Sequence, residues 1–219
     1  SLDIVRDHCR ARGIEWHLRS FSELGAEMDE IAGVAGECSP CTYCGVFRRK
    51  LMNDEAGRIG ARCIATGHNL DDMAQSVLMN FVRGDVERLA RLGPHTRVQP
   101  GLVPRILPLR LIPEKESLLY AIVSGIPFWD GECPYWTAAL RNQYRDVVDG
   151  LEARSPGSRH SILASYDRLR PLLTENLPAA GLHACACGEP TLGARCKACE
   201  LAETAVRRLE ARRGLRADP

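Results

Sequence analysis

The sequence has no apolar run long enough to cross a membrane, and no leader of basic and then apolar residues at its start. A membrane-spanning helix needs about 20 apolar residues in a row, and secretory leaders place an apolar stretch behind positive charge. The chain also has almost no net charge, with 29 Lys and Arg residues against 28 Asp and Glu residues. Any contact with nucleic acid must therefore use local patches. We expect a cytoplasmic protein that does not enter a membrane.

Cysteine is plentiful, and disulfide bonds are not its expected use. The chain has ten cysteines, and without a secretory signal such residues more often bind metal or carry thiol chemistry. They are also grouped, with one cluster at Cys38, Cys41 and Cys44 and another between Cys185 and Cys199. The pattern predicts a metalloprotein.

Helix and strand patterns alternate along the chain. The spacing of apolar residues predicts helices over residues 2–12, 44–59, 70–81, 114–124 and 140–153. Short apolar or alternating runs predict strands over 14–18, 63–66 and 125–128. The proline-rich segment 83–112 is typical of a loop. Strands that alternate with helices through short loops indicate an α/β fold with a parallel sheet.

The C-terminal cysteines have the spacing of a structural zinc site. Two pairs of thiolates on tight turns, separated by a short loop, can hold a tetrahedral zinc ion. The candidate ligands are Cys185, Cys187, Cys196 and Cys199. The first pair is Cys-x-Cys rather than Cys-x-x-Cys, so His183 is an alternative fourth ligand. We expect a zinc finger with a basic helical tail over residues 181–219, after a main domain over residues 1–180.

Cys41 and Cys44 form a Cys-x-x-Cys pair with no second pair nearby. Cys133, in a Glu-Cys-Pro turn, is the best third ligand, and Cys38 is an alternative. Three thiolates with one open position suit a 4Fe–4S cluster. The spacing is equally compatible with a redox dithiol or with ordinary core cysteines.

Residues 67–72, Gly-His-Asn-Leu-Asp-Asp, follow the predicted strand 63–66 and open the next helix. Ligands bind at this carboxyl edge of parallel sheets, and free N–H groups at a helix N-terminus can hold anions. The candidate nucleotide-binding residues are Gly67, His68, Asn69 and Asp71, with Asp72 as a candidate to position a metal ion or act on a nucleotide. The same residues also suit an ordinary helix start, with Asn69 as N-cap and the acids complementing the helix dipole.

Taken together, the motifs resemble the TtcA/TtuA family of tRNA 2-thiolation enzymes. The matching stretches are residues 41–53, 65–80, 131–135 and 187–199. They occur in the family's order, and the finger is similar to that of the TtuA branch, with the archaeal and eukaryotic cytosolic thiolases, rather than to TtcA. The resemblance implies a Rossmann-like HUP domain of the PP-loop ATPase type, with helices on both faces of a parallel sheet.

The resemblance also implies a reaction and a site. Members of the family use ATP, with Mg²⁺, to adenylate the C2 oxygen of a tRNA uridine or cytidine, and then replace that oxygen with sulfur. It implies that Cys41, Cys44 and Cys133 hold a 4Fe–4S cluster whose free iron carries the sulfide. Asp72 takes the family's essential acidic position, and Arg48 stands where a basic catalytic residue, often Lys, neutralises negative charge.

The implied partners are tRNA, a ubiquitin-like sulfur carrier with a C-terminal thiocarboxylate and, since dimers are common in the family, a second copy of the chain. We expect tRNA contacts from basic residues, although a solvated helix end is an equal interpretation of the tail. These residues are Arg48, Arg49, Lys50, Arg97, Arg105, Arg207, Arg208, Arg212 and Arg213.

Two family features are absent from the sequence. The phosphate-binding loop, Ser-Gly-Gly-x-Asp-Ser, does not occur, and neither does the family's N-terminal zinc finger. Both belong upstream of the helix that opens abruptly at Leu2, so we expect a truncated chain or a partner that supplies the loop. The alternatives are a non-catalytic remnant that binds metal and tRNA, and a closed zinc protein with a redox dithiol.

Overall fold

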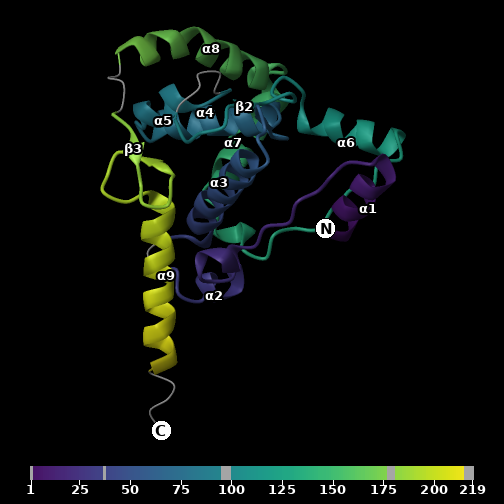
Figure 1. The fold of residues 1–219 in the computed structure, drawn as a ribbon. Coiled ribbons are helices and arrows are strands. Elements are labelled where there is room, and N and C mark those ends of the chain that lie inside the picture. The colour runs from purple at the N-terminus through teal and green to yellow at the C-terminus, as the bar shows by residue number, and fades with distance from the viewer. Residues whose placement is uncertain (1, 37, 95–99, 177–180, 215–219) are drawn as a thin grey trace.

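The computed structural model describes residues 2–36, 38–94, 100–176 and 181–214, and helices dominate it (Figure 1). The α-helices are α1 (Leu2–Arg12), α2 (Met28–Ala32), α3 (Pro40–Arg58), α4 (Leu70–Val82), α5 (Val86–Arg91), α6 (Glu114–Val123), α7 (Arg141–Arg154), α8 (Ser158–Asn176) and α9 (Lys197–Gly214). Two short 3₁₀ helices are η1 (Phe21–Leu24) and η2 (Trp136–Ala138). No described helix is both long enough and apolar enough to cross a bilayer.

Two small sheets accompany the helices. Strand β1 (Ile64–Ala65) pairs in parallel with β2 (Arg105–Ile106), and β3 (His183–Ala184) pairs antiparallel with β4 (Pro190–Thr191). The predicted α/β class is therefore confirmed as a helix-rich fold with a small parallel sheet. The strand predicted over 63–66 forms, although Ala65 is exposed. The prediction of a loop over 83–112 is wrong in part, because this segment contains α5 and β2.

Local signals in the sequence set the start of α4. The Asn69 side chain accepts the backbone N–H of Asp72 at 2.9 Å, and the Asp72 carboxylate accepts the N–H of Asn69 at 3.2 Å. Each side chain satisfies a donor that the first helical turn leaves free. The predicted helix over 70–81 and its N-cap are confirmed.

The strands predicted over 14–18 and 125–128 are wrong. Each segment is held by the helix before it: the Ile14 N–H donates to the Cys9 carbonyl, and the Ile126 N–H to the Ala121 carbonyl. A strand needs a neighbouring strand for its backbone groups, and neither segment has one among the described residues. Alternating polarity alone cannot supply that partner.

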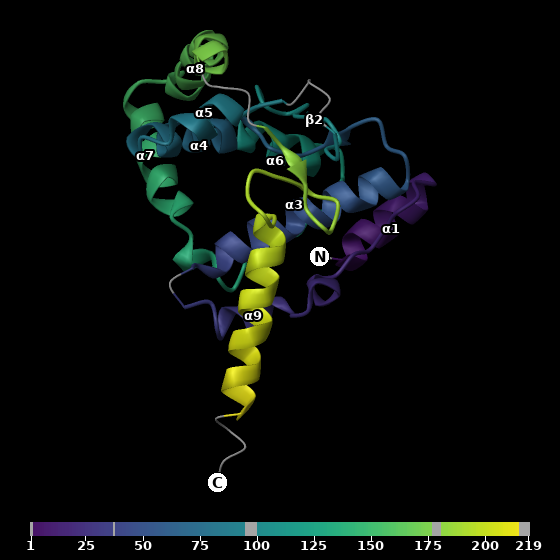
Figure 2. The same ribbon diagram turned by 60° about the vertical axis from the view of Figure 1, so that its left-hand side comes forward.

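The first of two hydrophobic cores joins α3 to the C-terminal module. Tyr43 and Phe47 of α3 are almost fully buried, and they share this core with Cys196, Leu201 and Ala205. Helix α9 packs on α3 and α2, and its C-terminal end points away from the rest of the protein (Figure 2). Within residues 181–214, the C-terminal module therefore packs on the helix that carries Cys41 and Cys44, and the division at residue 180 stays a prediction.

The second core lies between α4, α5 and α8. Leu70 and Met73 of α4 pack with Leu163 and Tyr166 of α8, and Figure 1 shows α8 lying across α4 and α5. Helix α7 also packs on α4. The candidate site residues lie on the first turns of α3 and α4 and on the segment from Cys133 to Arg141, which contacts both helices.

Candidate metal centre and nucleotide loop

The first turn of α3 presents two cysteines. Ser39 precedes the helix and Pro40 opens it, where the missing N–H of proline costs nothing. Tyr43 faces the core, so Cys41 and Cys44 stay partly exposed on other faces of the turn. A helix N-terminus carries partial positive charge and favours thiolates.

A segment far along the chain comes to this turn. The Cys41 Sγ lies 3.9 Å from the Tyr135 carbonyl oxygen, and the Tyr135 hydroxyl donates to Asp29 of α2. Burial raises the pKa of the Cys41 thiol, and the thiols of Cys133 and Cys44 raise it further. The three cysteines predicted as cluster ligands are therefore brought together from both segments.

The spacing of these thiols argues against a single metal ion. Zn–S bonds of about 2.3 Å at tetrahedral angles put sulfurs about 3.8 Å apart. Cys41, Cys44 and Cys133 do not form a group of donor atoms within 4.8 Å of one another. A 4Fe–4S cluster gives each thiolate its own iron and so holds ligands further apart. Three thiolate donors suit the chemistry of such a cluster, and the structure does not gather them at the separation of a zinc site.

Arg48 lies one turn after Cys44 on α3. Its Nη2 donates to the Cys44 Sγ at 3.2 Å, and its side chain is exposed. A guanidinium in this place stabilises a thiolate and offers its other donors to an incoming anion.

The loop after β1 gathers positive charge around one histidine. The Thr66 Oγ1 and the His68 Nδ1 are 2.8 Å apart. Partial desolvation lowers the pKa of His68; the Asp72 carboxylate opposes this, and Arg141, Arg105 and Arg48 add to the lowering. His68 is therefore favoured in its neutral form beside an acid and three arginines.

Asp72 is held at both carboxylate oxygens. Oδ2 accepts the Asn69 N–H, and Oδ1 accepts Nη1 of Arg141 at 2.9 Å. The Arg141 Nη2 donates to the Ser76 Oγ at 2.8 Å. Sequence reasoning missed Arg141, because the contact joins residues 69 positions apart and only the opening of a helix marks its place in the sequence.

Asp71 faces the interior instead. It is 6% exposed, its Oδ2 accepts the Glu114 N–H at 2.7 Å, and its Oδ1 pairs with Arg159 at 2.7 Å. These contacts tie α4 to the start of α6 and to α8. Of the two adjacent acids, Asp72 is the one that faces the loop.

The C-terminal cysteines form a closed group. Cys185, Cys187, Cys196 and Cys199 place their sulfurs within 4.8 Å of one another, and His183 is not among them. The Cys187–Cys196 and Cys185–Cys199 sulfur distances are 3.5 and 4.0 Å, close to the separation in tetrahedral zinc sites.

Backbone donors prepare one of these thiols for metal. N–H groups of Cys187 and Cys196 lower the pKa of Cys185 to about 6, while burial raises the pKa of Cys199. Neighbouring thiolates repel one another, and a bound divalent ion offsets that repulsion. The residues present fit a structural zinc ion.

Several of the basic residues expected to contact tRNA are already paired with other groups of the protein, and others are exposed. Lys50 is buried and paired with Asp54 at 2.8 Å. In the tail, Arg208 and Arg212 donate to carbonyls after α2 and Arg213 pairs with Glu30, whereas Arg207 is exposed. Arg97 lies outside the described residues.

Two arginines remain near the site. Desolvation lowers the pKa of Arg49, and the nearby guanidiniums of Arg105 and Arg88 lower it further. Desolvation also lowers the pKa of Arg105. Like charges gathered in this way are stabilised by a polyanion.

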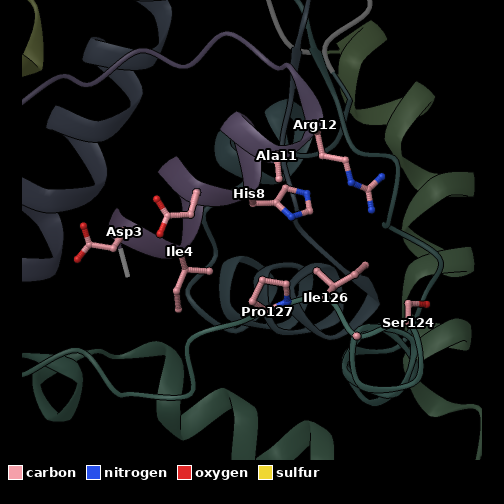
Figure 3. A pocket seen from close by; sticks show the side chains of 10 residues that line it. Asp3, Ile4, His8, Ala11, Arg12, Ser124, Ile126 and Pro127 are labelled. Atoms are coloured by element: carbon pink, nitrogen blue, oxygen red, sulfur yellow. The ribbon is translucent and has the colours of Figure 1, made fainter.

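A cleft of about 500 Å³ lies elsewhere, between α1 and the segment after α6 (Figure 3). Its walls include His8 and Arg12 of α1 and Ile126 and Pro127 of the facing segment. No predicted site residue lines it, so it takes no part in the candidate chemistry.

The chain is similar to known proteins, although no family model matches it. The chain is 39% identical over 194 residues to the tRNA 2-thiolation protein NcsA of Haloferax volcanii, covering 83% of this chain and 60% of that protein. It is 37% identical over 204 residues to the cytoplasmic tRNA 2-thiolation protein 1 of Xenopus laevis, covering 93% and 60%. It is 32% identical over 215 residues to the tRNA-5-methyluridine(54) 2-sulfurtransferase of Thermus thermophilus, covering 97% and 67%.

A solved structure agrees with these relatives. The U34-tRNA thiolase NcsA from Methanococcus maripaludis, with its 4Fe–4S cluster, matches with a TM-score of 0.74 and 37% identity, over 92% of this chain and 64% of that one. The chain thus spans 60% of the length of the first curated relatives. It belongs to the family of tRNA 2-thiolation proteins.

Proposed function

We propose that this protein is a tRNA 2-thiouridine synthetase that uses ATP and a 4Fe–4S cluster. The observation that carries the proposal is the meeting of two segments: the residues after Cys133 lie against Cys41, and the same segment continues into Arg141, which pairs with Asp72. One segment thus contacts both the first turn of α3 and the first turn of α4, which supports placing the thiols and the acid in one site. The names of the relatives support this assignment.

Cys41, Cys44 and Cys133 would hold the cluster. When bound, a cluster with one iron free of protein ligands can carry the sulfide that enters the product. Arg48, which donates to the Cys44 sulfur, would stabilise the thiolate and attract the anionic sulfur donor. The exposed position of its guanidinium suits both tasks.

The reaction would proceed in two steps, adenylation of the uridine and then attack by sulfur. The uridine C2 oxygen attacks the α-phosphorus of ATP and releases pyrophosphate; a hydrosulfide then attacks C2, and the oxygen leaves as part of AMP. Asp72 would position Mg²⁺ or take the proton released at sulfur, because its carboxylate is oriented and partly exposed.

The loop would hold the nucleotide. The candidates are Gly67, His68, Asn69 and Asp71, of which Asp71 would act by anchoring α4, given its internal contacts. Neutral His68 suits the edge of a base better than a phosphate. The family's phosphate-binding loop is not among these 219 residues, so the adenylation step needs that loop from elsewhere.

We further propose a second metal site, partners and a domain fold for this protein. The four C-terminal cysteines would bind zinc, Arg49 and Arg105 would contact tRNA phosphates, and a ubiquitin-like thiocarboxylate would supply sulfur. The small sheet would be part of a HUP domain with helices on both faces, in a cytoplasmic enzyme that forms homodimers. A non-catalytic remnant is less well supported, because the relatives are named as thiolation proteins.

The test is 2-thiouridine formation in a tRNA transcript, with ATP, Mg²⁺, sulfide and the segment or partner that supplies the phosphate-binding loop, after anaerobic cluster reconstitution. Mercury-gel retardation detects the thiolated tRNA. We expect ATP-dependent product from the wild type, about 10³-fold less from Asp72→Asn, and unchanged product from Asp146→Asn, an exposed acid on α7. Product formation without ATP, or full activity in Asp72→Asn, would contradict the proposal.

A further inference from the structure

Arg141 spans two side chains of α4. It is the first residue of α7, and its two terminal nitrogens donate to the Asp72 Oδ1 at 2.9 Å and the Ser76 Oγ at 2.8 Å. Asp72 and Ser76 lie one helical turn apart, and Ser76 is buried. The planar fork of a guanidinium fixes direction as well as charge, so Arg141 sets the orientation of the Asp72 carboxylate.

This ion pair is neither fully buried nor loosely exposed. The Asp72 side chain is 30% exposed and that of Arg141 is 38% exposed. Both Asp72 oxygens are engaged by donors, Asn69 on one side and Arg141 on the other. The carboxylate is therefore held in one direction while it stays reachable by a ligand.

The position of Arg141 depends on the segment that carries Cys133. The Trp136 N–H donates to the Cys133 carbonyl at 3.0 Å, and the Asn142 side chain donates to the Trp136 carbonyl at 2.7 Å. These bonds make one unit of residues 133–142. A shift of the Cys133 turn must therefore move the guanidinium that orients Asp72.

We propose that Arg141 is the positioning residue for Asp72 in thiolation. It acts through Asp72 and not on the substrate, and it holds the Asp72 carboxylate in one direction. This inference rests on the proposed function. It adds to that function a residue for which the sequence gives no motif.

The test compares steady-state thiolation, in the same loop-supplied assay, by the reconstituted wild type and by Arg141→Ala, Arg141→Lys and Arg145→Ala. Arg145 is the matched control, on the same helix, 54% exposed and paired with Glu114 only at 3.9 Å. We expect Arg141→Ala to lower kcat about 10- to 100-fold while the KM for tRNA changes less than about twofold. Lysine should restore part of kcat, because it supplies charge without the fork. Added guanidinium ion should also restore part of the Arg141→Ala rate, which it would not do for a purely structural residue.

A double-mutant cycle separates action through Asp72 from independent action. In the Asp72→Asn background, measured by single turnover, Arg141→Ala should add less than about twofold. Full additivity, a raised KM with unchanged kcat, or no rescue by guanidinium would overturn the positioning role. Equal activity of the wild type and Arg141→Ala would overturn only the positioning role of Arg141. An inactive wild type would overturn the proposed function and, with it, this role.

Discussion

At the scale of single residues, the surroundings of each cysteine indicate whether it can bind a metal. Cys196 is 2% exposed and belongs to the closed group of four, whereas Cys63 is exposed and belongs to no such group. The sequence spacing predicted the group of four but left the fourth ligand open between Cys185 and His183. The structure brings Cys185 into the group, because the β3–β4 hairpin turns its sulfur inward.

We therefore expect Cys196→Ser to lose about one zinc per chain, as measured by elemental analysis, and to unfold at a lower temperature. Cys63→Ser should keep its zinc. Retained zinc in Cys196→Ser, or lost zinc in Cys63→Ser, would show that the metal lies elsewhere.

A second residue-scale prediction concerns acid. A hydrogen bond from Arg58, with further contacts to Arg19 and His17, lowers the pKa of Glu55 from 4.5 to about 2. A depressed carboxyl pKa stabilises the folded state above its unfolded pKa, and that stabilisation is lost as the pH falls through the folded pKa. The loss should therefore fall between pH 4.5 and pH 2.

Glu55→Gln should be less stable than the wild type at pH 7, with the difference shrinking toward pH 2, as followed by urea unfolding. Glu116→Gln is the control, since Glu116 is an exposed residue of α6. A pH-independent difference between Glu55→Gln and the wild type would refute the ion-pair account.

At the scale of elements, α3 connects both proposed metal sites. Its first turn carries Cys41 and Cys44, while Phe47 is fully buried in the core that holds Cys196 and contacts Phe21 and Tyr43 edge-on. We expect Phe47→Ala to cost about 3–5 kcal/mol and to reduce the retention of both zinc and iron. Val147→Ala on the exposed side of α7 should cost less than about 0.5 kcal/mol. Loss of one metal without the other in Phe47→Ala would show that the sites are independent.

The same scale shows what the sequence could predict. Helix α4 was predictable because its apolar stripe and the Asn69 cap are local signals. The strands over 14–18 and 125–128 were wrong because a strand depends on a partner, and β2 was missed because its pairing with Ile64 joins distant segments. The contact between Arg141 and Asp72 escaped prediction for the same reason.

At the scale of the whole molecule, the chain is open. Its accessible surface is 14433 Å², against about 10,000 Å² for a compact monomer of this mass. Helix α6 buries none of its residues, and Leu119 is 60% exposed. We expect Leu119→Glu to leave the melting temperature unchanged, whereas Leu163→Ala, in the second core, should cost about 2–5 kcal/mol. A large loss in Leu119→Glu would mean that another surface covers α6.

The central claim, that Cys41, Cys44 and Cys133 hold a cluster apart from the C-terminal zinc, is tested most directly by metal analysis. The protein is purified without oxygen, and iron, zinc and visible absorption are measured for the wild type and Cys133→Ala. The account predicts about four irons and one zinc in the wild type, and loss of iron with zinc retained in the variant. Zinc alone in the wild type, or iron retained in Cys133→Ala, would contradict it.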